Sequence, residues 1–362
     1  MSTPVPQPGI LNISPYVGGK SKADESLKVA KLSSNESPLG ASPKAAQAIE
    51  QMTSELHRYP DGGSSELIEA IADIYGVKAE GIICGNGSDE LISLLIMAYA
   101  GIGDEVLYTE HGFLMYAISA SAVGATPVAA SEKDRTADVD SLLAAVTERT
   151  KMVFLANPNN PTGTYISDSE VKRLRAGLRD DILLVLDAAY AEYVVRDDYT
   201  PGIEMVETHD NVVMTRTFSK IYGLSALRLG WAYCPEAIVD VLHRIRGPFN
   251  VNAMAQAAGV AAVKDQAHIE MARAHNDKWL PILTQRFRGL GLGVTPSVGN
   301  FLLLDFDGTG KLALDAERYL AEQGLLLRAV GGYGLESCLR MSIGLDDENH
   351  AVIDALAEFV GG

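Results

Sequence analysis

The spacing of hydrophobic positions changes along the chain in a way that predicts alternating helices and strands. Segment 42–56, SPKAAQAIEQMTSEL, has apolar residues at helical spacing behind a serine that can cap a helix and a proline that suits its first position. Segment 64–76 is a second expected helix, which the serine pair Ser64–Ser65 opens and Gly76 closes. The expected strands that follow are 81–85, 104–109, 126–130, 151–156, 182–187 and 211–218, with expected helices at 88–101 and 114–124.

The later strands of this series are continuous apolar or β-branched runs bounded by polar turns. Strands of this composition are buried on both faces, and helices between strands produce parallel βαβ units. The chain from about residue 45 to residue 245 is therefore expected to form an α/β fold, with a mostly parallel sheet between layers of helices.

The C-terminal third has a different pattern. Segment 252–287 lacks strand signals and is expected to be helical, with a break at Pro281 because proline removes a hydrogen bond from a helix interior. Apolar runs at 301–306, 325–330 and 338–344 then predict strands of a smaller α+β domain, with helices at 311–324 and 346–360. We divide the chain into an N-terminal arm with part of the small domain (1–40), a large ligand-binding domain (41–250), connecting helices (251–285) and a small C-terminal domain (286–362).

Charge and composition narrow the range of partners. The 362 residues carry a net charge of −17, whereas nucleic acids and anionic membranes are bound through basic patches. The N-terminus lacks the pattern of a secretory signal and no stretch is apolar enough to span a membrane, so we expect a cytoplasmic protein. Cys84, Cys234 and Cys338 lie far apart in apolar contexts, which predicts buried free thiols. The histidines show no close ligand spacing, so no metal site is expected.

Polar residues gather where the expected strands end, and the first such group follows strand 81–85. In the stretch GNGSDE, Gly87, Ser88 and Asp89 lead from the strand into a helix, so that backbone N–H groups and the helix N-terminus can meet an anion. A dinucleotide fingerprint is not matched, because Glu90 stands where the third glycine would be. The stretch is either a phosphate cradle or a plain turn with a helix cap.

Three further strand ends carry chemistry. Asp187 ends strand 182–187, where a carboxylate needs a cation, a strong donor or a role as a helix cap. Asn160 lies in a loop rich in asparagine and proline that follows strand 151–156, and Lys220 follows strand 211–218. A single lysine at such a place is usually a solvated charge. Here all these residues share one edge of the sheet, where ligands of α/β folds bind.

Together these residue types match the needs of pyridoxal phosphate. A lysine near a low dielectric and other cations has a lowered pKa and can form a Schiff base. A carboxylate such as Asp187 suits the pyridinium nitrogen, and a glycine-lined helix start with Ser219 and Arg228 suits the phosphate. We therefore expect Lys220 to bind the cofactor covalently and Arg228 to contact its phosphate.

Several motifs carry a family resemblance over nearly the whole chain. NPNNPTG (157–163), DAAY (187–190) and the pattern SKxxxLxxxRxG (219–230) resemble the fold-type I pyridoxal-phosphate aminotransferases of the class II group. Within that group, LSSNESPLG, RYPDG and LRMSIG resemble the histidinol-phosphate aminotransferases. The resemblance implies the fold-type I architecture, a large domain with a mostly parallel seven-stranded-type sheet plus a smaller α+β domain. It also implies pyridoxal 5'-phosphate as cofactor and a homodimer with a shared active site.

The resemblance also implies individual roles in the cofactor site. Lys220 would be the Schiff-base lysine and proton carrier, and Asp187 would keep the ring nitrogen protonated. Tyr190 would join these two as a catalytic residue and, with Asn160, hydrogen-bond the ring hydroxyl oxygen. Phe113 would stack on the ring. The implied cofactor-binding residues are Gly87, Ser88, Asp89, Phe113, Asn160, Asp187, Tyr190, Ser219, Lys220 and Arg228.

For the substrates, the resemblance implies that Arg340 binds a carboxylate, which suits its two-pronged donor, and that Arg328 meets a substrate phosphate. Tyr16 and Asn35 would lie near the substrate, and Tyr59 would reach in from the other subunit. The implied reaction converts histidinol phosphate and 2-oxoglutarate into imidazole-acetol phosphate and glutamate.

Other activities remain open at this stage: an aromatic-amino-acid or broad class II aminotransferase, a threonine-phosphate-type decarboxylase, or a non-catalytic binder. The complete set of Asn160, Asp187, Lys220 and Arg228 argues against the binder, which would not need an imine-forming lysine.

Overall fold

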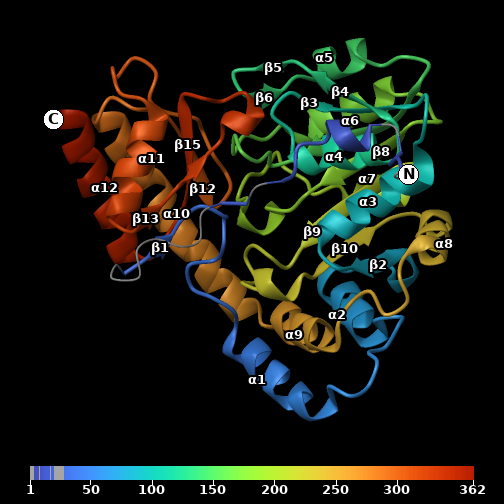
Figure 1. Ribbon diagram of the computed structural model, residues 1–362. Coiled ribbons are helices and arrows are strands. Elements are labelled where there is room, and N and C mark those ends of the chain that lie inside the picture. Colours follow the sequence, from blue (N-terminus) through green and yellow to red (C-terminus); the bar gives the residue numbers. More distant parts are fainter. Residues whose placement is uncertain (1–3, 8, 17, 20–27) are drawn as a thin grey trace.

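A seven-stranded sheet forms the centre of the larger part of the molecule (Figure 1). The computed structural model describes residues 4–7, 9–16, 18–19 and 28–362. Positions 1–3, 8, 17 and 20–27 of the predicted arm (1–40) lie outside the described residues. The strand order is β2-β10-β9-β8-β7-β3-β4. The bounds are β2 Ile82–Gly85, β3 Glu105–Thr109, β4 Thr126–Ala130, β7 Thr150–Ala156, β8 Leu183–Asp187, β9 Val212–Thr217 and β10 Gly230–Tyr233.

The predicted α/β architecture is confirmed. Strands β4, β3, β7, β8 and β9 pair in parallel, and only β10 runs antiparallel, between β9 and β2. Side chains on the two faces of the sheet enter two different hydrophobic cores, as expected of strands with uninterrupted apolar runs. A short hairpin of β5 (Glu132–Lys133) and β6 (Thr136–Ala137) lies outside this sheet.

Helices cover both faces of the sheet. Buried residues of α3 (Ser88–Tyr99), α4 (Leu114–Ala122) and α8 (Glu236–Ile245) pack on one face. Buried residues of α1, α2, α5, α6, α7 and α9 belong to the core on the other face, where α1 packs on α9. The bounds of this second set are α1 Pro43–Met52, α2 Ser65–Tyr75, α5 Val139–Ala144, α6 Asp168–Gly177, α7 Ile203–Thr208 and α9 Ala253–Lys264.

The two predicted helix starts have different caps. Helix α1 begins as predicted, with Ser42 Oγ accepting a hydrogen bond from Lys44 N at 3.1 Å. Helix α2 begins at Ser65, but the side chain of Ser64 does not cap it. The carboxylate of Asp61 accepts from the backbone N–H of Ser65 at 2.7 Å instead, and this hydrogen bond lowers the pKa of Asp61. A carboxylate near a helix N-terminus is stabilised by the helix dipole.

The smaller part of the molecule is built on a four-stranded antiparallel sheet of order β11-β12-β15-β14. The segment predicted as one strand at 325–330 is split into β13 and β14, and β13 pairs in parallel with β1 near the N-terminus. The core of this part includes Ala30 and Leu32, so we propose that the N-terminal segment belongs to the small domain. The bounds are β1 Ala30–Lys31, β11 Gly293–Val294, β12 Phe301–Asp305, β13 Leu325–Leu326, β14 Arg328–Ala329, β15 Cys338–Ser342, α11 Ala313–Glu322 and α12 Asp346–Gly361.

Helix α10, Gln266–Gly289, connects the two parts of the molecule, and Figure 1 shows it running from α9 to the small-domain sheet. The predicted break at Pro281 is wrong, because α10 continues through this residue. Trp279, Leu283 and Phe287, on both sides of the proline, are buried in the small-domain core. Burial of these large side chains outweighs the local cost of proline in a helix. The chain instead breaks at Asp265, between α9 and α10.

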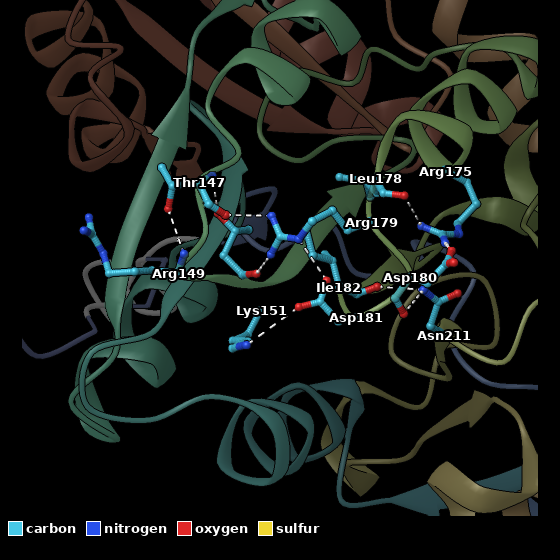
Figure 2. Close-up of polar contacts among 11 residues, drawn as sticks. Thr147, Arg149, Lys151, Arg175, Leu178, Arg179, Asp180, Asp181, Ile182 and Asn211 are labelled. Carbon is cyan, nitrogen blue, oxygen red and sulfur yellow. Dashed lines mark hydrogen bonds and ion pairs between the residues drawn. The ribbon is translucent and has the colours of Figure 1, made fainter.

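The amino-terminal ends of the central strands are tied together by polar contacts (Figure 2). Arg179 donates to the carbonyl oxygens of Thr147 at 2.8 Å and Thr150 at 3.1 Å, just before and at the start of β7. Asn211 donates to the carbonyl oxygen of Ile182 at 2.9 Å, which joins the loops that lead into β8 and β9. These contacts fix the loops at one edge of the sheet, and the predicted site residues lie at the opposite edge.

The three cysteines are free and buried, in agreement with the sequence prediction. Among the described residues, no helix combines the length and the apolar character needed to cross a lipid bilayer.

Candidate active site

A cavity of about 310 Å³ lies at the carboxyl ends of β7, β8 and β9. Residues from the start of α3, from β15 and from the segment 33–36 also line it. Most of the residues that the sequence singled out meet here, although they are spread over more than 300 positions. Those that line the cavity are Tyr16, Asn35, Ser88, Asp89, Phe113, Asn160, Asp187, Tyr190, Ser219, Lys220, Arg228, Arg328 and Arg340.

Lys220 projects into this cavity from the turn after β9. Its Nζ donates to the carbonyl oxygen of Ser34 at 3.3 Å and lies 5.5 Å from the centroid of the Tyr190 ring. Burial, followed by the nearby Arg340 guanidinium, lowers the pKa of Lys220 to about 8. An amine with this pKa is neutral in a large share of molecules near pH 8 and can act as a nucleophile or a base.

Asp187 ends β8 on the same side of the sheet. Its Oδ2 accepts a hydrogen bond from Tyr116 Oη at 2.6 Å and its Oδ1 accepts one from Thr215 Oγ1 at 3.1 Å. Burial raises the pKa of Asp187, while the two hydrogen bonds act in the opposite direction. The carboxylate therefore caps no helix, and a positive charge in the cavity would offset the cost of its burial.

The start of α3 and the side chain of Arg228 line one part of the cavity. Arg228 Nη1 donates to Ser219 Oγ at 3.2 Å, and its Nη2 donates to Asp89 Oδ2 at 3.0 Å. Gly87 has a positive φ of 84°, and a Cβ atom there would lie 2.6 Å from Arg228 Nη2, so only glycine fits. Because the Asp89 carboxylate is paired with Arg228, an anion would be held by the guanidinium, by hydroxyl groups such as Ser88 Oγ and by backbone N–H groups.

Arg340 of β15 enters the cavity from the small domain. Its Nη1 donates to Asn160 Oδ1 at 2.5 Å, and its Nη2 donates to the carbonyl oxygen of Ser33 at 2.7 Å. Its Nε is buried and has no hydrogen-bond partner. Burial lowers the pKa of this guanidinium. A buried donor left unpaired costs about 1–3 kcal/mol, so the site favours an acceptor such as a carboxylate at this position.

Asn35 links Tyr190 to the small domain. Its Nδ2 donates to Tyr190 Oη at 2.9 Å, and its backbone N–H donates to Ser342 Oγ of β15 at 2.7 Å. Asn35 has a positive φ of 54°, a conformation that asparagine tolerates better than most residues. Burial raises the pKa of Tyr190 to about 12, so its hydroxyl stays protonated at neutral pH.

Phe113, Tyr16 and Arg328 lie on the walls of the same cavity. Phe113 precedes α4 and packs edge-on against Tyr116, with ring centroids 5.9 Å apart. The Arg328 guanidinium lies 5.9 Å from the centroid of the Tyr16 ring. A second cavity of about 610 Å³ adjoins this wall and also contains Tyr16 and Arg328.

Tyr59 is the predicted site residue that the structure places elsewhere. It is 83% exposed and stacks on Phe249, with ring centroids 4.7 Å apart. Both side chains lie outside the cavity, so a single chain does not bring Tyr59 to the other site residues.

Sequence reasoning missed the two residues that hold Asp187. Thr215 pairs directly with Asp187 in the register of β8 and β9, and it is the first of three polar residues that follow three apolar ones in the strand VVMTRT. This change from apolar to polar residues within one strand was a usable signal. Tyr116 has no exposed surface and stands in an apolar helix, where nothing in the sequence shows that its hydroxyl points at a strand end.

The cavity combines a buried lysine, a buried carboxylate and a glycine-lined helix start with an arginine, on a mostly parallel sheet. These features agree with the family that the sequence comparison identifies. The chain belongs to the class I and II aminotransferase family, whose sequence profile matches residues 28–356.

Two curated relatives extend over the full length of the chain. One is the histidinol-phosphate aminotransferase of Paramagnetospirillum magneticum, 59% identical over 100% of both chains. Another is the histidinol-phosphate aminotransferase of Rhodospirillum centenum, 54% identical over 100% of both. Among solved structures, that of histidinol-phosphate aminotransferase from Sinorhizobium meliloti in complex with pyridoxal-5'-phosphate is similar, with a TM-score of 0.86, 30% identity and 92% of each chain covered.

Proposed function

We propose that this protein is a pyridoxal-phosphate-dependent aminotransferase of histidine biosynthesis. It would convert histidinol phosphate and 2-oxoglutarate into imidazole-acetol phosphate and glutamate. The observation that carries the proposal is the meeting of Lys220, Asp187 and Arg228 in one cavity, each with a different chemical character. The relatives that are 54–59% identical over the full length support the choice of substrate.

The donor set of the cavity fits pyridoxal phosphate. Asp187 is buried among neutral partners and would pair with the protonated ring nitrogen. The cradle at Gly87, with Arg228 and Ser219, would hold the phosphate. Lys220 would bind the aldehyde carbon. When bound, this cofactor supplies an electron sink for the negative charge left on the substrate carbon.

The residues of the chain then have distinct tasks. Lys220 Nζ, whose pKa of about 8 leaves a large share of molecules neutral near pH 8, accepts the proton that leaves the amine-bearing carbon of the substrate and acts as general base and acid. Asp187 keeps a positive charge in place at the far end of the cavity. Tyr190, held by Asn35, offers a protonated hydroxyl as a hydrogen-bond donor, and Arg340 orients an anionic group of the substrate.

The proposal includes a homodimer in the cytoplasm with active sites shared between subunits. Tyr59 and Phe249 form an exposed aromatic pair on a single chain. Exposed aromatic pairs are typical of surfaces that a partner covers. A second copy of the chain on this surface would place Tyr59 at the edge of the partner's cavity.

Replacing Arg340 by alanine is expected to raise the KM for glutamate by about 10- to 100-fold, because a hydrogen-bonded charge contact is worth about 1.5–3 kcal/mol. Arg340→Lys should recover little of this loss, since an ammonium cannot reproduce the two-pronged contact. The matched variant is Arg328→Ala, which should raise the KM for histidinol phosphate more than the KM for glutamate. Steady-state kinetics with both donors measures the difference. An effect of Arg340→Ala on histidinol phosphate alone would reverse the two assignments.

Single-turnover spectroscopy tests the substrate. The cofactor-loaded protein is mixed separately with histidinol phosphate and with phenylalanine, and the loss of the visible absorbance of the lysine-bound cofactor is followed. The proposal expects much faster conversion with histidinol phosphate. Comparable or faster conversion with phenylalanine would make the protein an aromatic or broad-range aminotransferase. Release of carbon dioxide from phosphothreonine would instead support a decarboxylase.

A further inference from the structure

A buried charge pair joins Arg216 of β9 to Glu192, which follows Tyr190 closely in the chain. Arg216 lies close to Lys220 in the sequence, and none of the roles described so far uses the pair. Arg216 donates from Nη2 at 2.7 Å and from Nε at 3.3 Å to Glu192 Oε1. The two side chains are only 3% and 7% exposed. Burial lowers the pKa of Arg216, but Glu192, Tyr75 and Tyr222 together outweigh this effect and the net shift is upward. An ion pair this deeply buried is costly unless its remaining hydrogen bonds are satisfied.

Two tyrosine hydroxyls satisfy those bonds. Tyr75, the last residue of α2, accepts from Arg216 Nη2 at 3.2 Å and donates to Glu192 Oε1 at 3.2 Å. Its oxygen lies 2.5 Å from that of Tyr222, so the Tyr222 hydroxyl acts as the donor to Tyr75. The Arg216 guanidinium also lies 4.9 Å from the centroid of the Tyr75 ring. We call Tyr75, Glu192, Arg216 and Tyr222 the buried tyrosine–arginine cluster.

Tyr222 connects this cluster to the turn that carries Lys220. The turn is closed by hydrogen bonds from Gly223 N to Lys220 O and from Leu224 N to Phe218 O, both at 3.0 Å. The Tyr222 ring packs on the Phe218 ring with centroids 4.6 Å apart, and both side chains are almost fully buried. Phe218, Ile221, Tyr222 and Leu224 all bury their side chains and anchor the backbone around Lys220. Tyr222 is the one of these four that carries a hydroxyl group.

Glu192 connects the same cluster to the opposite wall of the cavity. It lies in the short helix Ala191–Tyr193 directly after Tyr190, whose ring faces the amine of Lys220 at 5.5 Å. Arg216 stands on β9, four residues before Lys220. The cluster thus joins the segment of Tyr190, the segment of Lys220 and the end of α2 through hydrogen bonds between buried groups.

We propose that the buried tyrosine–arginine cluster positions Lys220, because it fixes the turn 218–224 to the Tyr190 segment and holds the amine over the Tyr190 ring, away from bulk water. Tyr222, Tyr75, Glu192 and Arg216 are positioning residues and do not touch the reacting atoms. The inference rests on the proposed role of Lys220. What it claims in addition is that the cluster sets the position of the Lys220 amine and its exposure to water.

The effect can be read from the titration of Lys220. Besides burial, Arg340 lowers the pKa of its amine, whereas Asp89, Tyr16 and Glu36 raise it, and the Asp187 carboxylate also interacts electrostatically with this amine. None of these belongs to the cluster. A looser turn would admit water to the amine while leaving these groups in place. The pKa of Lys220 would then rise from about 8 toward its ordinary value of 10.5.

The experiment uses the cofactor-free protein. Wild type and Tyr222→Phe are acetylated over a range of pH, and mass spectrometry follows the modification of Lys220. The control is Tyr233→Phe, which removes another buried tyrosine hydroxyl at the far end of β10, where its contacts are long, 3.4–3.5 Å. We expect the labelling pKa of Lys220 to rise by about one unit or more in Tyr222→Phe and to stay unchanged in Tyr233→Phe.

Kinetics of the cofactor-loaded variants give a second readout. Tyr222→Phe should lower kcat by about tenfold or more, because small displacements of a reacting group are costly, with KM within about twofold of wild type. Tyr75→Phe should behave alike, and the double variant should lose no more than either single variant, since both hydroxyls share one hydrogen bond. Tyr75→Phe leaves the packing of Tyr222 on Phe218 intact. If Tyr222→Phe does not fold, Tyr75→Phe therefore tests whether the cluster positions Lys220.

The outcomes separate this inference from the proposed function. A drop in melting temperature with an unchanged labelling pKa and unchanged kcat would show that the cluster only stabilises the fold, and would overturn the inference. If Tyr222→Phe raises the labelling pKa of Lys220 but the wild-type protein does not transaminate histidinol phosphate, the inference is supported and the proposed function is wrong.

Discussion

Replacing Lys220 by alanine is expected to lower kcat by about 10,000-fold, the upper end of what a positioned acid–base group contributes. The variant loses both the covalent link to the cofactor and the base that takes the substrate proton. It should still bind pyridoxal phosphate noncovalently, because Arg228, Ser219 and Asp187 remain in place. Single-turnover kinetics measures the first effect, and equilibrium dialysis of the cofactor measures the second.

Two controls accompany this prediction. Lys264→Ala removes an exposed lysine at the end of α9 and should leave kcat unchanged. A small amine such as methylamine, added to Lys220→Ala, should restore part of the activity because it can carry the missing proton. Activity of Lys220→Ala within tenfold of wild type would exclude this lysine as the proton carrier.

Replacing Asp187 by asparagine is expected to lower kcat by about 10- to 1,000-fold. Asparagine has nearly the same shape, but it cannot stabilise a positive charge on the ring nitrogen. A neighbouring opposite charge shifts a pKa by about 1–3 units, and each unit corresponds to about 1.36 kcal/mol, or one factor of ten. The pH dependence of the cofactor absorbance, together with single-turnover rates, measures the loss.

Tyr116→Phe is the matched variant for this carboxylate. It removes the 2.6 Å hydrogen bond to Asp187 Oδ2 but leaves the negative charge. Its effect on kcat should therefore be smaller than that of Asp187→Asn. Equal losses in the two variants would mean that the hydrogen bond, and not the charge, supports the reaction, which would sink the role assigned to Asp187.

The large sheet was predictable because its strands are long apolar runs whose polar ends share one edge. Ligands of α/β folds bind at the carboxyl ends of the strands, and this rule alone predicted that Lys220, Asp187 and Asn160 lie close together. Strand β10 was missed because it has only four residues and begins at Gly230, where a Cβ atom would lie 2.3 Å from Ser88 N. A glycine that permits close backbone approach looks, in a sequence, like a loop glycine.

Other features depend on contacts that local patterns do not encode. The local rule for proline predicted a helix break at Pro281, but burial of Trp279 and Phe287 in the small-domain core overrides it. The network of Asn35 with Ser342 joins positions 307 residues apart. Only the resemblance to a family placed Asn35 near the substrate, and no role was predicted for Ser342. The place of Tyr59 could not be predicted from one chain, since its proposed partner is a second copy.

The hydrogen bond between Asn35 and Ser342 also bears on synthesis of the protein. A growing chain emerges from the ribosome at about 5–20 residues per second, and all seven strands of the large sheet precede residue 234. The large sheet can thus assemble before the segment that contains β15 has been made. Asn35 can form its hydrogen bond only after Ser342 has emerged, and Arg340 emerges just before it. The substrate side of the cavity is therefore completed well after the large sheet.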